Sequence, residues 1–264
     1  MDLQLASRHV LITGGSKGIG LACANGFLAE GAHVTLVSRD RTTLDAARDS
    51  LLKAFPGGKV HVCSADLKVA AAALAAIEDA EQAMGPVDVL VNSAGAARRT
   101  PPAELTPQHW RDAMDAKFFT YVNMTDPLVK RMAQRGAGVV LNIVGMGGKV
   151  ASPTHLAGGS ANAALMLMSA GLAAAYGPKG VRVNAVNPAL TLTERMDEGL
   201  AADARLNNIT KEEALAKASA RMPLGRVASP EEIANAVLFL CSPRASYISG
   251  AIVSMDGAVT PLVV

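Results

Sequence analysis

A glycine-rich turn near the N-terminus carries the first chemical signal in the sequence. Residues 13–20 read Thr-Gly-Gly-Ser-Lys-Gly-Ile-Gly and follow a short apolar run, His9–Thr13. Glycines let the backbone bend sharply and approach a phosphate, and the N-terminus of the following helix faces the negative charge. We therefore expect a dinucleotide to bind here, at the positions Thr13, Gly14, Ser16, Lys17, Gly18, Ile19 and Gly20.

Charged side chains near this turn indicate which dinucleotide binds. The second apolar run ends at Ser38-Arg39, and Lys17 lies inside the glycine turn. A carboxylate at the end of that run would bond a ribose 2′-hydroxyl, whereas cations would hold a 2′-phosphate. Two cations therefore favour NADP(H) over NAD(H). Asp40 is expected to cap the next helix, and a role for it in binding NAD is the alternative.

The elements that position these residues form a regular alternation. Short β-branched runs are each followed by a longer segment with helical periodicity, which predicts a parallel sheet covered by helices on both faces. Right-handed crossovers then give a single doubly wound, Rossmann-like α/β domain over residues 1–264, with ligands at the carboxyl ends of the strands. The expected strands are His9–Thr13, His33–Ser38, Lys59–Cys63, Val87–Asn92, Gly138–Val144, Val181–Asn187 and Ala251–Met255. The expected helices are Ile19–Glu30, Thr42–Ala54, Lys68–Met84, Thr106–Ala133, Thr154–Tyr176 and Pro230–Leu240.

One polar, alanine-rich segment, Glu194–Arg221, interrupts the alternation. Thr210 precedes Lys211-Glu212-Glu213 as a helix N-cap, and Ser229 starts a capping box for the last helix. Because the segment stands between a strand end and that helix, we expect it to be a helical lid over the site.

Composition excludes several classes of protein. The chain is 50% hydrophobic and carries a net charge of +2 with both signs interspersed, so nothing favours nucleic acid or an acidic membrane as a partner. Cys23, Cys63 and Cys241 have no second Cys at metal-site spacing, so we expect buried free thiols and no metal site. No stretch is expected to match a spanning helix, and no leader pattern opens the chain, which predicts a cytoplasmic protein.

The spacing Gly-x-x-x-Gly-x-Gly at residues 14–20 resembles the short-chain dehydrogenase/reductase family, and the resemblance continues over nearly the whole chain. Further matches are Asp66, Asn92-Ser93-Ala94-Gly95, Asn187-Pro188, Pro223-Leu224-Gly225-Arg226 and Asp256-Gly257.

This resemblance implies roles for residues beyond the glycine turn. Asp66 would bond the adenine amino group, Asn92 and Gly95 would support the strand ends beneath the cofactor, and Thr193 would reach the nicotinamide amide. Ordinary turn and cap chemistry is the alternative for Asn92 and Thr193. The remaining implied cofactor contacts are Ser38, Arg39, Leu67, Ala94, Pro188 and Leu190.

The family's catalytic residues do not stand at the positions where the resemblance places them. In the family a Tyr exchanges a proton with the substrate oxygen, a nearby Lys assists it, a Ser orients the carbonyl, and an Asn on the preceding long helix completes a proton relay. With the register fixed by Asn142 and by Ala163-Ala164-Leu165, these four positions become Gly158, Asn162, Gly145 and Lys117.

The candidate catalytic residues are therefore Lys117, Asn162 and His155. Lys117 and Asn162 look like the family's Asn and Lys exchanged between two helices, which would keep an ammonium near the active centre; coincidence is the alternative. His155 is the candidate proton donor because an unperturbed histidine titrates near neutral pH, at about 6.5. A helix-terminal or substrate-contact role is its alternative. The other histidines are expected to be packing or surface residues without partners: His9, His33, His61 and His109.

Three functions fit these features. The first is an NADP(H)-dependent oxidoreductase for a carbonyl or alcohol substrate, with a proton route through Lys117, His155 or a water. The second is a non-redox enzyme such as a lyase or isomerase, and the third is a catalytically silent NADP(H)-binding subunit. The cofactor-binding residues and the lid segment are both present in the sequence, which favours the oxidoreductase. The apolar lid residues Met196, Leu200 and Met222 hint at a hydrophobic small-molecule substrate, and the resemblance implies a homotetramer.

Overall fold

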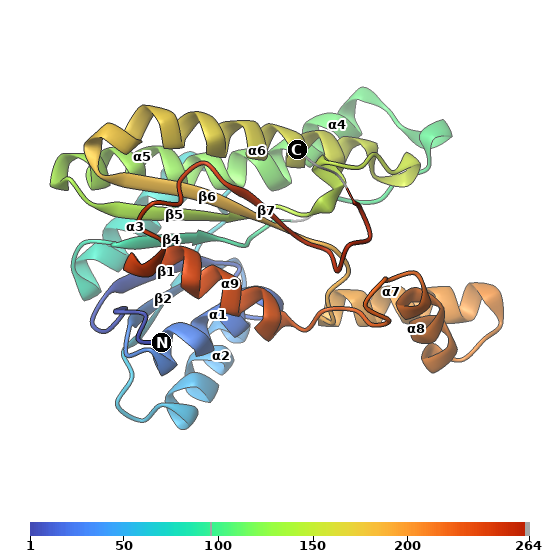
Figure 1. The fold of residues 1–264 in the computed structure, drawn as a ribbon, viewed down its shortest axis with the longest axis horizontal. Helices are drawn as coiled ribbons and strands as arrows, with labels where there is room; N and C mark the ends of the chain where they lie inside the picture. The colour runs from blue at the N-terminus through green and yellow to red at the C-terminus, as the bar shows by residue number, and fades with distance from the viewer. Residues whose placement is uncertain (96, 262–264) are drawn as a thin grey trace.

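A parallel sheet of seven strands runs through the centre of the molecule, with helices on both faces (Figure 1). The computed structural model describes residues 1–95 and 97–261. The strand order is β3-β2-β1-β4-β5-β6-β7, and every neighbouring pair is parallel. The predicted doubly wound, Rossmann-like fold is confirmed.

The strands begin and end within two residues of the predicted positions. They are β1 (His9–Thr13), β2 (His33–Ser38), β3 (Val60–Ser64), β4 (Val89–Asn92), β5 (Gly138–Ile143), β6 (Val181–Pro188) and β7 (Ile252–Met255). The α-helices are α1 (Gly18–Ala29), α2 (Arg41–Ala54), α3 (Ala70–Met84), α4 (Pro107–Ala113), α5 (Thr120–Arg135), α6 (Leu156–Tyr176), α7 (Glu194–Asn207), α8 (Lys211–Ala220) and α9 (Pro230–Cys241).

Side chains of the central strand β1 divide between two apolar cores. Val10 and Ile12 pack in one cluster with residues of α1, α2 and α9, whereas Leu11 packs in a second cluster with residues of α3 and α5. All three side chains are fully buried. A strand that is buried on both faces is apolar on both faces, which explains why the sequence of β1 is a nearly continuous apolar run.

The long helix expected from Thr106 to Ala133 is not continuous. Residues Met114–Phe119 form a π-helix, η2, between α4 and α5, and Lys117 lies within it. A π-turn widens the helix by one residue and often occurs at functional sites. Apolar periodicity does not reveal such an insertion, so the expectation of a single helix was wrong at this point.

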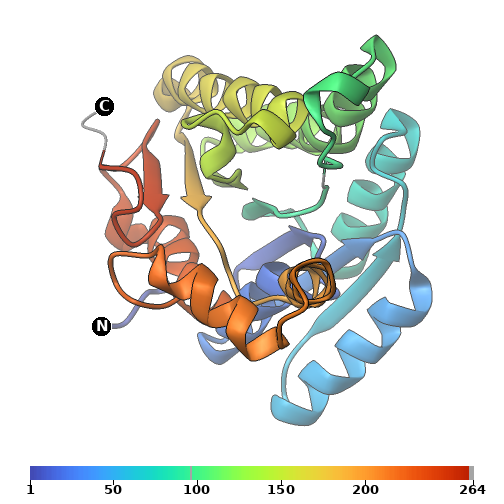
Figure 2. The ribbon, with the colours of Figure 1, turned by 90° about the vertical axis from the view of Figure 1, so that its right-hand side faces the viewer.

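The segment after β6 is helical, as expected, and it folds as two helices, α7 and α8. α7 and α8 project from the sheet and its covering helices (Figure 1), and from their own side they stand in front of the sheet (Figure 2). Leu200, Ala204 and Ala214 form a small core between them. Thr210 caps α8 by accepting a hydrogen bond from the Glu213 backbone N–H at 3.1 Å, as predicted.

One segment in the described part of the chain, Pro153–Lys179, is long and apolar enough to cross a membrane by length and composition alone. The expectation that no stretch would reach this length was wrong. The segment contains α6, which packs along β6, with Ala161, Leu165 and Ser169 buried. These contacts make it a covering helix of the sheet.

His9 is a buried histidine with two partners, contrary to the expectation that it has none. Its Nδ1 lies 2.7 Å from Gly85 O, and its Nε2 lies 2.9 Å from Thr35 Oγ1. Because a carbonyl can only accept, Nδ1 carries the proton, and neutral Nε2 accepts from the hydroxyl. Burial is the main cause that lowers the pKa of His9.

This histidine should make the free energy of unfolding depend on pH. A lowered pKa in the folded state means that the unfolded chain binds the proton more tightly, so stability falls as pH drops below about 6.5. In urea titrations between pH 5 and 8, His9→Gln should reduce this dependence. An unchanged slope below pH 6.5 in the variant would show that His9 does not cause it.

Candidate active site

The glycine turn joins β1 to α1, as the sequence predicts, and its backbone requires glycine. Gly14 and Gly18 have φ values of +66° and +56°, a region that other residues rarely adopt. A Cβ atom on Gly20 would lie only 2.8 Å from the Gly14 carbonyl carbon. The backbone is thus free of side chains where α1 begins, which suits close approach by a pyrophosphate.

Thr13 ties this turn to the segment after β4. Its fully buried Oγ1 accepts hydrogen bonds from the backbone N–H groups of Ser93 and Ala94, at 3.0 and 3.1 Å. A Cβ on Gly14 would lie 3.0 Å from the Ala94 backbone, so the two segments are in close contact. Gly95 is also needed as glycine, because it has φ +97° and a Cβ there would clash with Ala116 O.

The end of β2 offers polar groups to a ligand. Ser38 Oγ is buried and makes no hydrogen bond within the described part of the chain, while the neighbouring Arg39 is exposed. Asp40 accepts a hydrogen bond from Thr43 N at 2.9 Å and caps α2, as expected. Lys17 is exposed and pairs with Glu194 at 3.5 Å. The unpaired hydroxyl and the two exposed cations fit a phosphorylated ribose.

The other expected cofactor residues line the same edge of the sheet. Asp66 follows β3 and accepts from Lys68 N at 3.1 Å. Leu67 is buried, and its carbonyl accepts from Asn123 Nδ2 at 2.9 Å. A Cβ on Gly18 would lie 3.4 Å from Thr193 Cγ2, so the start of the helical pair meets the glycine turn. Pro188 is the last residue of β6, and Leu190, whose side chain is exposed, lies between it and Thr193.

A chain of buried polar side chains forms the floor of the site. Asn92 Nδ2 donates to Thr125 Oγ1 and to Asn142 Oδ1, both at 2.9 Å. Asn142 Nδ2 donates to Ser169 Oγ at 2.9 Å. These bonds link β4 and β5 to α5 and α6, and buried networks of this kind fix relative positions when their groups are paired.

Lys117 reaches the end of β5 from the π-helix. Its Nζ donates to Ile143 O at 3.1 Å and to Tyr121 Oη at 2.9 Å, and it lies 4.6 Å from the Tyr121 ring centroid. Tyr121 Oη donates to Ile143 O at 2.6 Å. Both side chains are buried, and burial raises the pKa of Tyr121. The hydroxyl therefore stays neutral and holds the ammonium in place.

Tyr121 was not identified from the sequence as a site residue. It lies four positions after Lys117, one helical turn along, which was the available signal. A lone Tyr on an apolar helix face is usually a packing residue, so the spacing alone did not distinguish it.

His155 occupies space that a side chain at position 158 would need. A Cβ on Gly158 would lie 2.7 Å from His155 Nε2, and one on Gly147 would lie 2.9 Å from His155 Cδ2. Contacts this close force a neighbour to shift, so the imidazole keeps its present position because both residues are glycine; a Cβ on Gly158 would also lie 2.8 Å from Ala97 Cβ. His155 immediately precedes α6; the residue is partly exposed, and its Nδ1 atom is buried.

Asn162 lies on the same helix and faces the same loop. It is buried, and its Nδ2 lies 3.4 Å from the Cβ position of Gly145 and 3.5 Å from that of Gly147. The structure thus brings the three candidate catalytic residues around the end of β5. Lys117 approaches Ile143, whereas Asn162 and His155 approach the glycines that follow.

In a parallel doubly wound sheet, a glycine-rich turn at the point where the strand order reverses is typical of dinucleotide-binding proteins. Here that turn follows β1, beside β4. Comparisons with known proteins identify the class more closely. A family model described as enoyl-(acyl carrier protein) reductase matches residues 14–260. The 3α-hydroxysteroid dehydrogenase of Mediterraneibacter gnavus is 33% identical over 258 residues, covering 98% of this chain and 99% of that protein.

Solved structures agree with the family match. L-sorbose reductase from Gluconobacter frateurii, solved with NADPH and L-sorbose, has a TM-score of 0.95 and 31% identity over the full length of both chains. A short-chain oxidoreductase from Pseudomonas aeruginosa, described as containing an atypical catalytic center and solved with NADPH, has a TM-score of 0.89 and 28% identity, covering 98% of this chain and 100% of that one. The chain belongs to the short-chain dehydrogenase/reductase family, NAD(P)-dependent oxidoreductases of alcohol and carbonyl substrates.

The contact between His155 and Gly158 can be tested by adding one methyl group. Gly158→Ala places a Cβ against the imidazole, so the ring must move, and we expect a loss of about 1–3 kcal/mol in the free energy of unfolding. Gly171→Ala is the matched control on α6, because its Cβ would meet nothing within 4 Å. That change should stabilise the helix by up to about 1 kcal/mol.

Urea unfolding of both variants measures the difference. Equal stabilisation by the two substitutions would show that the imidazole does not occupy the space beside Gly158.

Proposed function

We propose that this chain is an NADP(H)-dependent oxidoreductase in which His155 exchanges the proton with the substrate oxygen. The observation that carries the proposal is the packing of the imidazole over Gly158, the position where the family has its Tyr. A carbonyl that gains a hydride becomes an alkoxide, so a proton donor must lie beside the reacting carbon. His155 brings a titratable group to that position from three residues earlier in the chain.

The cofactor residues support NADP(H). The glycine turn and the N-terminus of α1 would hold the pyrophosphate, and Ser38, Arg39 and Lys17 would hold the 2′-phosphate. When bound, the cofactor supplies or accepts the hydride. L-sorbose reductase and the Pseudomonas oxidoreductase were both solved with NADPH, which supports the same preference here.

Lys117 and Asn162 would act on the substrate oxygen from either side of His155. The Lys117 ammonium is held by Ile143 O two residues before Gly145, so it can stabilise negative charge that develops near this loop. Tyr121 is a positioning residue, because it contacts the ammonium. The Asn162 amide faces the Gly145 position, where the family Ser orients the carbonyl. The Pseudomonas protein is described as containing an atypical catalytic center, which supports the proposal that the catalytic residues can differ among such proteins.

The lid, the substrate class and the oligomeric state are also part of the proposal. The α7–α8 pair would act as a lid, since Thr193 at its start adjoins the glycine turn. Met196 and Leu200, the lid residues that we expected to face a hydrophobic substrate, instead pack in the core between α7 and α8, so we propose a small-molecule substrate without assigning its polarity. The exposed Leu167 on α6, with 78% of its surface accessible, supports helix contacts between subunits, and we propose a homotetramer in the cytoplasm.

The cofactor assignment predicts a change of preference on charge reversal. Arg39→Asp should weaken NADPH binding and leave NADH binding equal or tighter, because a carboxylate repels the 2′-phosphate and can accept from a 2′-hydroxyl. A charged hydrogen bond contributes about 1.5–3 kcal/mol, so NADPH affinity should fall about tenfold to a hundredfold. Fluorescence titration measures both constants, and an unchanged NADPH-to-NADH ratio would contradict the assignment.

The proposed proton route predicts large losses of turnover. His155→Ala should lower kcat by about two orders of magnitude or more while leaving the Kd for NADPH within a few-fold, since general acid catalysis contributes about 10²–10⁴. Lys117→Met should also lower kcat, and the double variant should lose less than the product of the two single losses if both residues serve one step.

Lys130 is an exposed lysine on α5, so Lys130→Met is the matched control and should keep wild-type turnover. The measurement is steady-state oxidation of NADPH with a ketone substrate. Wild-type kcat in His155→Ala would remove His155 from the route.

A further inference from the structure

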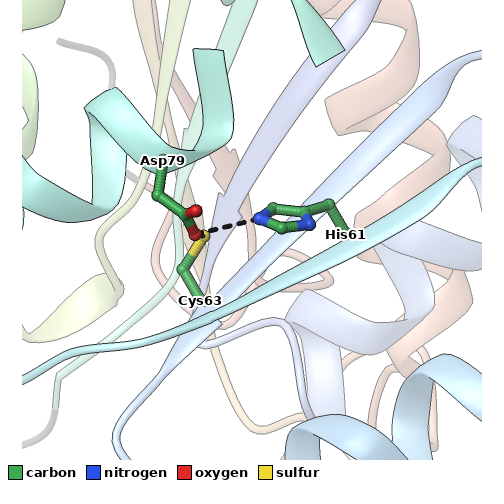
Figure 3. Close-up of side chains that lie close together, drawn as sticks. All are labelled: His61, Cys63 and Asp79. Atoms are coloured by element: carbon green, nitrogen blue, oxygen red, sulfur yellow. Dashed lines mark hydrogen bonds and ion pairs between the residues drawn. The ribbon is translucent and has the colours of Figure 1, made fainter. Parts of the chain in front are cut away.

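Three side chains of different chemistry converge at the outer edge of the sheet (Figure 3). His61 and Cys63 lie two residues apart on β3 and therefore share one face of this edge strand. Asp79 comes from α3, which packs on that face. One Oδ2 atom of Asp79 lies 2.9 Å from His61 Nε2 and 3.0 Å from Cys63 Sγ.

The three residues differ in burial, with the thiol inside and the other two side chains partly open to solvent. Cys63 is 5% exposed, whereas the side chains of His61 and Asp79 are 28% and 56% exposed. The thiol and the imidazole together hold the pKa of the Asp79 carboxyl below its usual range, so the group is a carboxylate. Arg41 is a nearby cation, but its guanidinium is already paired with Asp45 at 2.9 Å.

We propose that His61, Cys63 and Asp79 form a binding site for a divalent cation of borderline softness, with Zn²⁺ as the best fit. One nitrogen, one sulfur and one carboxylate oxygen lie within 4.8 Å of one another, and these are the three donor types that zinc uses in proteins. The sulfur ligand disfavours Mg²⁺ and Ca²⁺, which prefer oxygen. A water from the open side would complete a tetrahedron.

The ligand atoms must move by up to about 1 Å to hold the ion, because His61 Nε2 and Cys63 Sγ, which lie within 4.8 Å of each other, must come to about 3.6 Å. Zinc bonds of about 2.0–2.3 Å in a tetrahedron place ligand atoms about 3.3–3.6 Å apart. The Asp79 oxygen is closer than that to both partners, so it must retreat by about half an ångström, and its exposed side chain is free to do so. Coordination replaces the thiol proton and the proton that His61 Nε2 donates to Asp79. The thiol proton passes to the buffer, and the imidazole proton moves through solvent to Nδ1.

The site joins β3 to α3 behind the adenosine end of the proposed cofactor pocket. β3 ends at Ser64, whose Oγ donates to Arg39 O at 2.9 Å, and Asp66 follows two residues later. A metal here would therefore stabilise the folded state by mass action and fix the strand that carries these residues. Sequence spacing did not predict the site, because its third ligand lies sixteen residues beyond Cys63.

The test is direct metal binding by the full-length protein after treatment with a chelator. Zn²⁺ titrated in competition with a chromophoric chelator should give one ion per chain, with a Kd in the micromolar range or tighter. Cys63→Ser and Asp79→Asn should each weaken binding by about tenfold or more. Cys241→Ala, which removes a different buried thiol, should leave the affinity unchanged.

Co²⁺ provides a second readout, since thiolate coordination gives a charge-transfer absorption band that Cys63→Ser should abolish. Asp79 is largely exposed, so Asp79→Asn keeps the test valid if the cysteine variant fails to fold. No saturable Zn²⁺ binding at tenths of a millimolar, or affinity equal to wild type in Asp79→Asn, would overturn the proposal.

Discussion

The arrangement of the active site depends on the lack of a side chain at position 158. A Cβ there would lie 2.7 Å from His155 Nε2, and the same imidazole lies against the bare backbone of Gly147. Gly147 and Gly158 thus leave open the space that the His155 imidazole occupies. We propose that Gly158 stands at the position of the family's Tyr, in which case the absence of that side chain and the placement of His155 are linked by packing.

The buried ammonium of Lys117 is the second constraint on the site. A buried charge costs several kcal/mol unless polar groups compensate it. Ile143 O and the neutral Tyr121 hydroxyl supply part of that compensation, and the Tyr121 ring lies 4.6 Å from the ammonium. The π-helix places Lys117 for this contact, which explains why a regular helix was not maintained between α4 and α5.

Local patterns in the sequence were sufficient for most of the fold. The alternation of apolar runs predicted all seven strands within two residues, and capping residues such as Asp40 and Thr210 marked helix starts. The glycine turn was also readable, because its chemistry lies within eight consecutive residues. These features are local, so a single stretch of chain carries the whole signal.

Contacts between distant segments could not be read in the same way. The Lys117–Ile143 bond spans 26 positions, and the His61–Asp79 pair spans 18. Tyr121 and the π-helix were missed because their significance depends on what β5 places opposite them. His155 was proposed because it lies three residues before the expected position of the family's Tyr, but its packing against Gly158 depends on the folded backbone.

The pH dependence of single-turnover NADPH oxidation tests the proposed role of His155 as the proton donor. Wild-type protein and His155→Ala would be mixed with NADPH and the ketone that reacts fastest in a panel including L-sorbose and a 3-oxosteroid. For ketone reduction, the account predicts a wild-type rate constant that falls as pH rises through the titration of an imidazole, and a slower, pH-independent rate constant in the variant. Identical rate constants and pH profiles for the two proteins would contradict it.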